Sequence, residues 1–409
     1  MTADANEAGS FRLRAALLAG RIVRVAHRAS RRSGDGIHSR GLAIITIDPR
    51  AIETLSRGRQ TALVTGTNGK TTTTYLLARA LGGDVVHNFT GANMHSGIAA
   101  AYADSDARVA ALEVDELHLA SVATMTKPGV MVLLNLSRDQ LHRSHEVART
   151  AASWREAVGS TNALIVANCA DPNIVAITPP DRAIWFDPGT RWTDDAQVCL
   201  RCGSLVHWEL ATWWCACGLR MPTADFRYED RALISRDGRR HEFHLGIPGD
   251  FNYGNAVAAA VAAQAMGVDL ETALGRMQGL NSAFGRFQLY DIGGRPARLV
   301  LAKNPAGMLA ALDLVGDSQV ILGINARDVD GRDTSWLYDV PFELLAGRQI
   351  GATGERRHDL ALRLEIAGAL PVVSGDIHGL AKALPAGQLC LIGNYSNFFT
   401  WRRERAWPE

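Results

Sequence analysis

The chain has 409 residues, of which 47% are hydrophobic, and its formal net charge is +1 at pH 7. A chain of this length can bury a large core in roughly two or three domains, and its small net charge gives no general attraction to nucleic acid. It has no apolar run of about 18 residues that could span a bilayer, and no N-terminal segment typical of a secretion signal. We therefore expect a globular cytoplasmic protein.

Residues 1–54 precede the first predicted strand and form a basic lead-in segment. Between residues 10 and 34 the chain carries seven arginines and no acidic residue. Six apolar side chains recur there at spacings compatible with one helical face. They are Phe11, Leu13, Leu17, Leu18, Ile22 and Val25. The pattern predicts a basic amphipathic helix, and two interpretations stay open: packing on its own protein, or peripheral contact with an anionic membrane surface.

From residue 61 to about 170, short β-rich runs alternate with helical ones. The predicted strands are ALVT, RVAALEV, VMVLLN and ALIVAN. This alternation predicts a parallel sheet covered by helices, with ligands bound at the carboxyl ends of the strands. We expect the central domain to span residues 55–296 and to include a helix at NAVAAAVAAQAMGV, residues 255–268.

Cysteines, tryptophans and charged turns break the alternation between residues 190 and 245, so this stretch is predicted to hold an insertion. A second α/β set follows, with the strand-like runs ARLVLA, SQVILGIN, LPVVSG and QLCLIGN. It predicts a smaller C-terminal α/β domain over residues 297–409. Gly293 and Gly294 mark the expected boundary.

The segment TALVTGTNGKTTTTYLLARAL, residues 61–81, has the composition of a phosphate-binding loop between a strand and a helix. Gly66 and Gly69 allow a tight turn that brings backbone N–H groups close to a phosphate. Lys70 can reach the β- and γ-phosphates, and the Thr71 hydroxyl can bind Mg²⁺. The common pattern has glycine at position 64, where this chain has Val64, so the loop is a variant.

A Mg·ATP site needs a second anionic ligand at a strand end, and the segment LEVDE supplies three candidates. Glu113 directly follows the apolar run and is therefore the best placed at the tip of the strand. Asp115 and Glu116 are better explained as an ordinary solvated acidic turn.

Four of the six cysteines lie close together in the sequence, as Cys199-x₂-Cys202 and Cys215-x-Cys217. Twelve residues separate the pairs, which lets two short knuckles converge on one tetrahedral Zn²⁺. The second pair is tighter than the usual spacing, so His207 remains an alternative ligand. Four closed ligands leave no position for water, so we expect a structural zinc ribbon at about residues 195–222.

Several motifs resemble those of the Mur ligase superfamily, enzymes that couple ATP cleavage to amide-bond formation. GTNGKTTT is similar to their ATP loop, NLSRDQLHRSHE (135–146) to an Asn-x-x-x-Asp-x-Leu segment, and FGRFQ to an arginine turn. GDFNYGNAVAAA resembles their adenine-contact helix, with Phe251 in place of histidine. LAKNPAG, DVDGRDTSWLYDVPFE and the four cysteines resemble the branch that amidates a lipid-linked peptidoglycan precursor. The resemblance covers the chain from about Gly36 onward.

The resemblance implies roles for particular residues. The following would bind ATP through the loop, the adenine-side asparagines and the phosphate-side cations: Gly66, Thr67, Asn68, Gly69, Lys70, Thr71, Thr72, Asn252, Asn255, Arg286 and Lys303. Thr71 and Glu113 would hold Mg²⁺, and Lys70 and Glu113 would also take part in catalysis.

The irregular stretch GRDTSWLYDVPFE, residues 331–343, is predicted to be a site loop. Asp339 matches an aspartate that is implicated in amidation within the family, and an acid there could orient or deprotonate an incoming ammonium ion. The remaining acids of this region are better explained as exposed loop residues. They are Asp328, Asp330 and Asp333.

Cys169 and Cys390 stand alone in apolar surroundings, and neither lies in the glycine-flanked turn expected of a glutaminase nucleophile. Ammonia would then come from a separate glutamine amidotransferase subunit, which agrees with the resemblance.

The sequence thus predicts an ATP- and Mg²⁺-dependent ligase that converts the D-glutamate α-carboxyl of a lipid-linked stem peptide to D-isoglutamine. Two alternatives stay open: a Mur-type ligase that adds an amino acid, and a nucleotide-binding regulatory protein without chemistry. The short segment before the loop argues against a UDP-linked substrate, and the intact site residues argue against a loss of chemistry.

Overall fold

A computed structural model describes residues 2–29, 36–88, 91–139, 147–190, 192–281, 287 and 289–404. The chain forms two compact units. The first comprises residues 1–136, 148–244 and 252–278, and the second comprises residues 137–147, 245–251 and 279–409.

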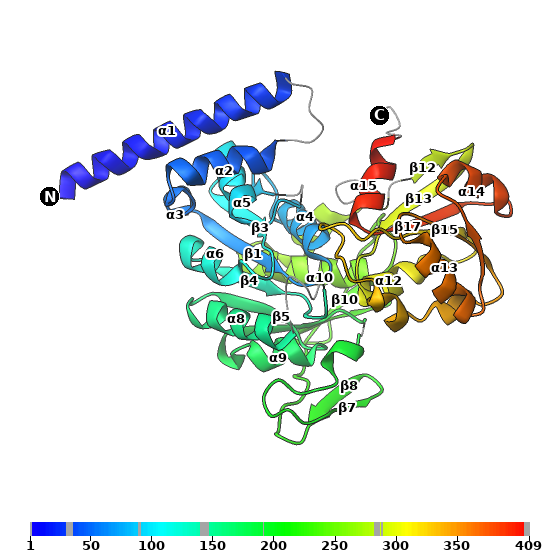
Figure 1. The fold of residues 1–409 in the computed structure, drawn as a ribbon. Coiled ribbons are helices and arrows are strands. Elements are labelled where there is room, and N and C mark those ends of the chain that lie inside the picture. Colours follow the sequence, from blue (N-terminus) through cyan, green and yellow to red (C-terminus); the bar gives the residue numbers. More distant parts are fainter. Residues whose placement is uncertain are drawn as a thin grey trace. The chain divides into compact units, whose positions relative to one another are not determined.

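A nine-stranded sheet forms the core of the first unit, in the order β11-β10-β9-β6-β5-β4-β1-β3-β2 (Figure 1). Its strands are β1 (Gln60–Thr65), β2 (Val86–His87), β3 (Val109–Glu113), β4 (Val130–Leu133), β5 (Leu164–Asn168), β6 (Ala183–Asp187), β9 (Phe226–Glu229), β10 (Ala232–Ser235) and β11 (Arg240–Glu242). The strands from β2 to β6 are parallel to their neighbours, which confirms the predicted parallel sheet. The strand order reverses at β1, because β3 pairs with one edge of this strand and β4 with the other. Ligands of open α/β sheets bind at such a point.

Helices surround this sheet, in agreement with the alternating sequence pattern. They are α1 (Thr2–Ala29), α2 (Ile37–Ile47), α3 (Ala51–Ser56), α4 (Lys70–Leu81), α5 (His95–Asp104), α6 (Leu119–Thr126), α8 (Val147–Gly159), α9 (Pro172–Ile177), α10 (Asp250–Ala265) and α11 (Leu270–Met277). Within the described ranges, none of the helices has the length and apolar character needed to cross a membrane.

The cysteine-rich segment is smaller than the break in the sequence pattern suggests. Two strands, β7 (Val206–Glu209) and β8 (Thr212–Cys215), form a hairpin separate from the large sheet. One cysteine pair precedes β7, and the other lies at the end of β8. After it, β9 pairs with β6 in parallel, and β10 and β11 extend the large sheet antiparallel. The later part of residues 190–245 therefore belongs to the sheet rather than to an insertion.

A six-stranded sheet forms the core of the second unit, in the order β12-β13-β17-β14-β15-β16. Its strands are β12 (Leu289–Ile292), β13 (Arg295–Leu301), β14 (Gln319–Gly323), β15 (Gln349–Thr353), β16 (Leu370–Val373) and β17 (Leu389–Gly393). The helical elements are α12 (Pro305–Leu312), η3 (Ser335–Asp339), η4 (Phe342–Leu345), α13 (Arg357–Ile366), α14 (Ile377–Ala383) and α15 (Tyr395–Glu404). Gly293 and Gly294 form the turn between β12 and β13, so the expected domain boundary does not coincide with the division into compact units.

Candidate functional site

The predicted phosphate loop lies between β1 and α4, as the motif requires. Gly66 and Gly69 both have positive φ angles, of 156° and 87°. A Cβ atom on Gly69 would lie 2.6 Å from Asn255 Oδ1, so this glycine is needed for space as well as for backbone conformation. Lys70 and Thr71 then begin the helix, where the amide N–H groups of the first turn and the helix dipole favour an anion.

Lys70 lies almost buried inside the loop. Its Nζ atom donates to the carbonyl oxygens of Gly66 at 2.5 Å and Thr67 at 3.3 Å, and forms an ion pair with Glu116 Oε1 at 2.7 Å. The exposed fractions of the Lys70 and Glu116 side chains are 8% and 13%. The interpretation of Glu116 as part of a solvated turn is therefore wrong. Asp115 does have a turn role, because its carboxylate accepts from the backbone N–H of Leu117.

Glu113 lies at the carboxyl end of β3, beside the start of α4. The Thr71 hydroxyl donates to its Oε2 atom at 2.7 Å, so the two predicted magnesium ligands are adjacent. Asn93 donates to the other carboxylate oxygen at 3.0 Å, and Asn88 exchanges two hydrogen bonds with the Glu113 backbone. A buried carboxylate next to a hydroxyl at the end of a phosphate loop is the donor set that fits Mg²⁺.

Asparagines hold the loop from both sides. Asn135, which follows β4, accepts from the backbone N–H of Asn68 at 2.8 Å and donates back to its carbonyl oxygen at 3.1 Å. On α10, Asn252 is fully buried and Asn255 lies against Gly69. The sequence placed Asn135 in a family motif but predicted no role for it. In the structure its side chain holds the backbone of the phosphate loop at Asn68.

The second unit contains a small polar pocket of about 60 Å³ at the carboxyl edge of its sheet. Lys303 follows β13 and forms an ion pair with Asp139, and Asp339 at the end of η3 forms one with Arg138 at 3.2 Å. All four side chains line the pocket. A cavity of this volume holds a few water-sized molecules, including an ammonium ion, but not a nucleotide.

Asp330 fixes the loop that leads to Asp339. Its carboxylate accepts from the Ser396 backbone N–H at 2.7 Å and from the Ser396 hydroxyl at 2.6 Å, at the start of α15. Asn325 donates to the same hydroxyl. Asp330 is 2% exposed, so its interpretation as an exposed loop acid is wrong. Asp328 is exposed and pairs with Arg332, as expected of a surface residue.

Arg286 lies outside the described residues, as do residues 140–146 of the asparagine-containing motif. Asp333, the third of these loop acids, is exposed and accepts from the backbone N–H of Ser335.

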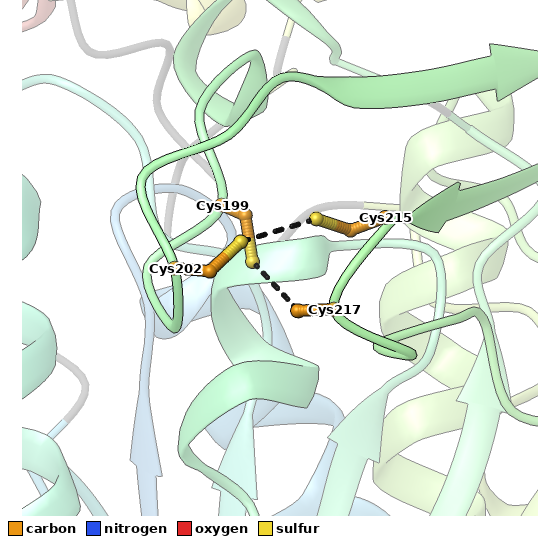
Figure 2. A group of neighbouring side chains, drawn as sticks. All are labelled: Cys199, Cys202, Cys215 and Cys217. Atoms are coloured by element: carbon orange, nitrogen blue, oxygen red, sulfur yellow. Dashed lines mark hydrogen bonds between the residues drawn. The ribbon is translucent and has the colours of Figure 1, made fainter.

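Figure 2 shows the four clustered cysteines turned toward one another. The Cys199 and Cys217 sulfurs are 3.7 Å apart, the Cys202 and Cys215 sulfurs are 3.4 Å apart, and all four lie within 4.8 Å. Tetrahedral Zn²⁺ with sulfur ligands at ~2.3 Å requires separations of about 3.8 Å. His207 does not belong to this group, because its ring stacks on Trp214 at 4.2 Å.

Hydrogen bonds prepare one thiol of the cluster for ionisation. The backbone N–H and then the hydroxyl of Ser204, followed by the Cys215 thiol, lower the pKa of Cys202 to about 6. At Cys215 the backbone of Cys217 lowers the pKa, but burial and the neighbouring sulfur atoms outweigh it and raise the value to about 12. A cation among the four sulfurs would favour the thiolate form of each cysteine.

Two family models match the chain. The Mur ligase middle domain matches residues 64–186, which include the phosphate loop and Glu113. The MurT ligase C-terminal domain matches residues 301–389, which include Lys303 and Asp339. A solved pseudomurein peptide ligase type C from Methanothermus fervidus has the same fold, with a TM-score of 0.71, 18% sequence identity, and coverage of 89% of this chain and 83% of that one. These matches define the class of fold: the chain has a Mur ligase-like α/β fold.

Its curated homologues are more specific. The lipid II isoglutaminyl synthase (glutamine-hydrolyzing) subunit MurT of Staphylococcus aureus strain N315 is 29% identical, over 92% of this chain and 94% of its own length. The MurT subunit of Streptococcus pneumoniae strain R6 is 28% identical, over 86% of each chain. The chain is thus a homologue of the MurT subunits, and these relatives indicate an ATP-dependent ligase.

Proposed function

We propose that the chain is the synthetase subunit of a lipid II isoglutaminyl synthase. It would amidate the α-carboxyl group of D-glutamate in the lipid II stem peptide to D-isoglutamine, through an acyl phosphate. The observation that carries this proposal is the similarity to MurT subunits over 92% of the chain, together with a MurT-type model in the second unit.

The phosphate loop supports the first half of the reaction. Mg²⁺ held by Thr71 and Glu113 would supply charge neutralisation for ATP, since both oxygens are already adjacent. Lys70 would act as a counter-charge for the transferring phosphoryl group, and Asn252 and Asn255 would contact the adenine side. We also propose that Lys303 and Arg286 contact the nucleotide phosphates.

The pocket in the second unit supports the second half. Asp339 presents a half-exposed carboxylate in a space large enough for an ammonium ion, and Arg138 fixes its orientation. Such a carboxylate would orient the ammonium ion and accept its proton, which frees the lone pair for attack on the acyl phosphate. We propose that the ammonia comes from a GatD-like glutamine amidotransferase subunit, because the MurT relatives are named as subunits of a glutamine-hydrolysing enzyme.

The cysteine cluster would hold one structural Zn²⁺. Four sulfur ligands at nearly tetrahedral separations leave no open position for a reacting water, so the metal would stabilise the hairpin rather than take part in amidation.

The test is the Asp339→Asn variant, with Asp328→Asn as a matched control on the same stretch but outside the pocket. Asparagine is nearly isosteric but a far weaker base, so nucleotide affinity should stay near the parent value while amidation is lost. Partial recovery with free ammonium at high pH would indicate a deprotonating role, and no recovery would indicate orientation. Parent-rate amidation by Asp339→Asn, or a defect confined to ATP binding, would refute the assignment.

A further inference from the structure

The long N-terminal helix α1 packs on α2 (Figure 1), and over residues 11–27 its buried side chains lie on one face. Ala16 and Gly20 are buried on this face, and a Cβ atom on Gly20 would lie 2.9 Å from the Ile44 side chain of α2. Arg24 adds an ion pair with Asp104 at 3.1 Å. The helix is therefore held on the first unit with a defined orientation.

The opposite face of α1 carries an exposed apolar stripe, which we call the outer stripe. It consists of Phe11, Leu18, Ile22 and Val25, with exposed fractions of 75%, 59%, 60% and 65%. At 100° per residue these positions fall within an arc of about 60°, and they extend over about 21 Å of helix. Leu13 and Leu17, which the sequence grouped with them, are half-buried and belong to the other side.

Arginines flank the outer stripe, more closely on one side than on the other. Arg14 and Arg21 lie along one edge, whereas Arg12 lies about 80° beyond the other edge, and all three are exposed. Residues 10–34 contain seven arginines and no acidic residue. The helix thus combines a continuous apolar face with flanking positive charge, as helices that lie in the interface of a bilayer do.

We propose that the outer stripe docks on an anionic membrane surface, with its four apolar side chains in the acyl boundary and the flanking arginines on lipid phosphates. A second copy of the chain fits less well, because two stripes face to face over residues 11–25 would bring like-charged arginines together, and this part of α1 holds no acidic residue; Asp4 and Glu7 precede the stripe. An anionic bilayer offers both an apolar layer and negative charge.

This inference deepens the proposed function, because a lipid-linked substrate lies at such a surface. The two can fail separately. Membrane binding is measured without ATP or substrate, whereas amidation can be measured with substrate dissolved in detergent micelles, where docking on a bilayer is not needed.

The test is co-sedimentation of the full chain with vesicles of phosphatidylcholine alone or mixed with phosphatidylglycerol. Leu18→Asp/Ile22→Asp should weaken binding to anionic vesicles at least about tenfold, since two apolar side chains no longer leave water. Leu362→Asp/Ile366→Asp is the matched control, because it changes the same exposed residue types at the same spacing on α13. It should bind like the parent.

Charge is tested by Arg14→Glu/Arg21→Glu, which should abolish the preference for anionic vesicles, and by salt, which should weaken parent binding. Circular dichroism and thermal unfolding confirm that each variant is folded. Equal binding of the parent chain and the stripe variant would overturn the proposal, as would absence of parent binding. Dissociation of a parent oligomer by the stripe variant, without an effect on vesicle binding, would instead identify a protein interface and also overturn it.

Discussion

Replacing Lys70 separates the role of this side chain in stability from its role in chemistry. In the folded protein Lys70 and Glu116 form a nearly buried ion pair at 2.7 Å. Lys70→Ala leaves the Glu116 carboxylate without this partner, and breaking such a pair costs about 3 kcal/mol of unfolding free energy. Lys70→Ala/Glu116→Gln removes the stranded charge and should recover much of that loss.

The double variant should recover stability but not activity, because both variants lack the Lys70 side chain. Loss of the main side-chain counter-charge for the transferring phosphoryl group should lower kcat by about 100-fold or more. Urea unfolding gives the free energies, and ATP-dependent amidation gives the rates. Recovery of both activity and stability in the double variant would show that Lys70 serves only to neutralise Glu116. Full activity in a well-folded Lys70→Ala protein would show that this loop does not carry the ATP chemistry.

Three further outcomes are expected. Freshly purified protein should contain one Zn²⁺ per chain, and Cys199→Ser should lose it; elemental analysis without zinc, or a disulfide among the four thiols, would contradict this. Asp330→Asn should reduce kcat about tenfold with near-parent ATP affinity, because the loop leading to Asp339 loses its charged anchor on Ser396; unchanged kinetics would show that the anchor is dispensable. Asp171 is the N-cap residue of α9. Burial raises its pKa from 3.8 to about 6, so this group favours the folded state below about pH 4 and loses that contribution as pH rises through 6. Relative to Asp171→Asn, the parent should lose up to about 3 kcal/mol of unfolding free energy between pH 4 and pH 7, and an equal difference at both pH values in urea unfolding would refute this.

The sequence contained enough information for the sheet and for the loop that crosses its edge. Short stretches of sequence are enough to predict these features. Gly66 and Gly69 indicate the turn of the loop, and the apolar run that ends before Glu113 indicates the end of a strand. The adjacency of Thr71 and Glu113 follows from two neighbouring parallel strands, which the alternation of strands and helices already predicted.

Contacts between distant segments could not be predicted in this way. Glu116 resembles any acid in a solvated turn until the fold brings it to Lys70, 46 residues away. Asp330 meets Ser396 across 66 residues, and no local pattern marks that pair. The sequence also could not tell which apolar residues of α1 are buried against α2 and which are exposed. Both sets follow the same helical periodicity, and only the packing of α1 on α2 distinguishes them.

The most direct test of the proposed function is the product formed from lipid II. Purified chain would be incubated with lipid II, ATP, Mg²⁺ and glutamine, with and without a glutamine amidotransferase subunit, and the stem peptide analysed by mass spectrometry. The proposal predicts conversion of the D-glutamate α-carboxyl group to a carboxamide only when the second subunit or free ammonium is present. Attachment of an amino acid, or ATP cleavage with an unchanged stem peptide under all these conditions, would contradict it.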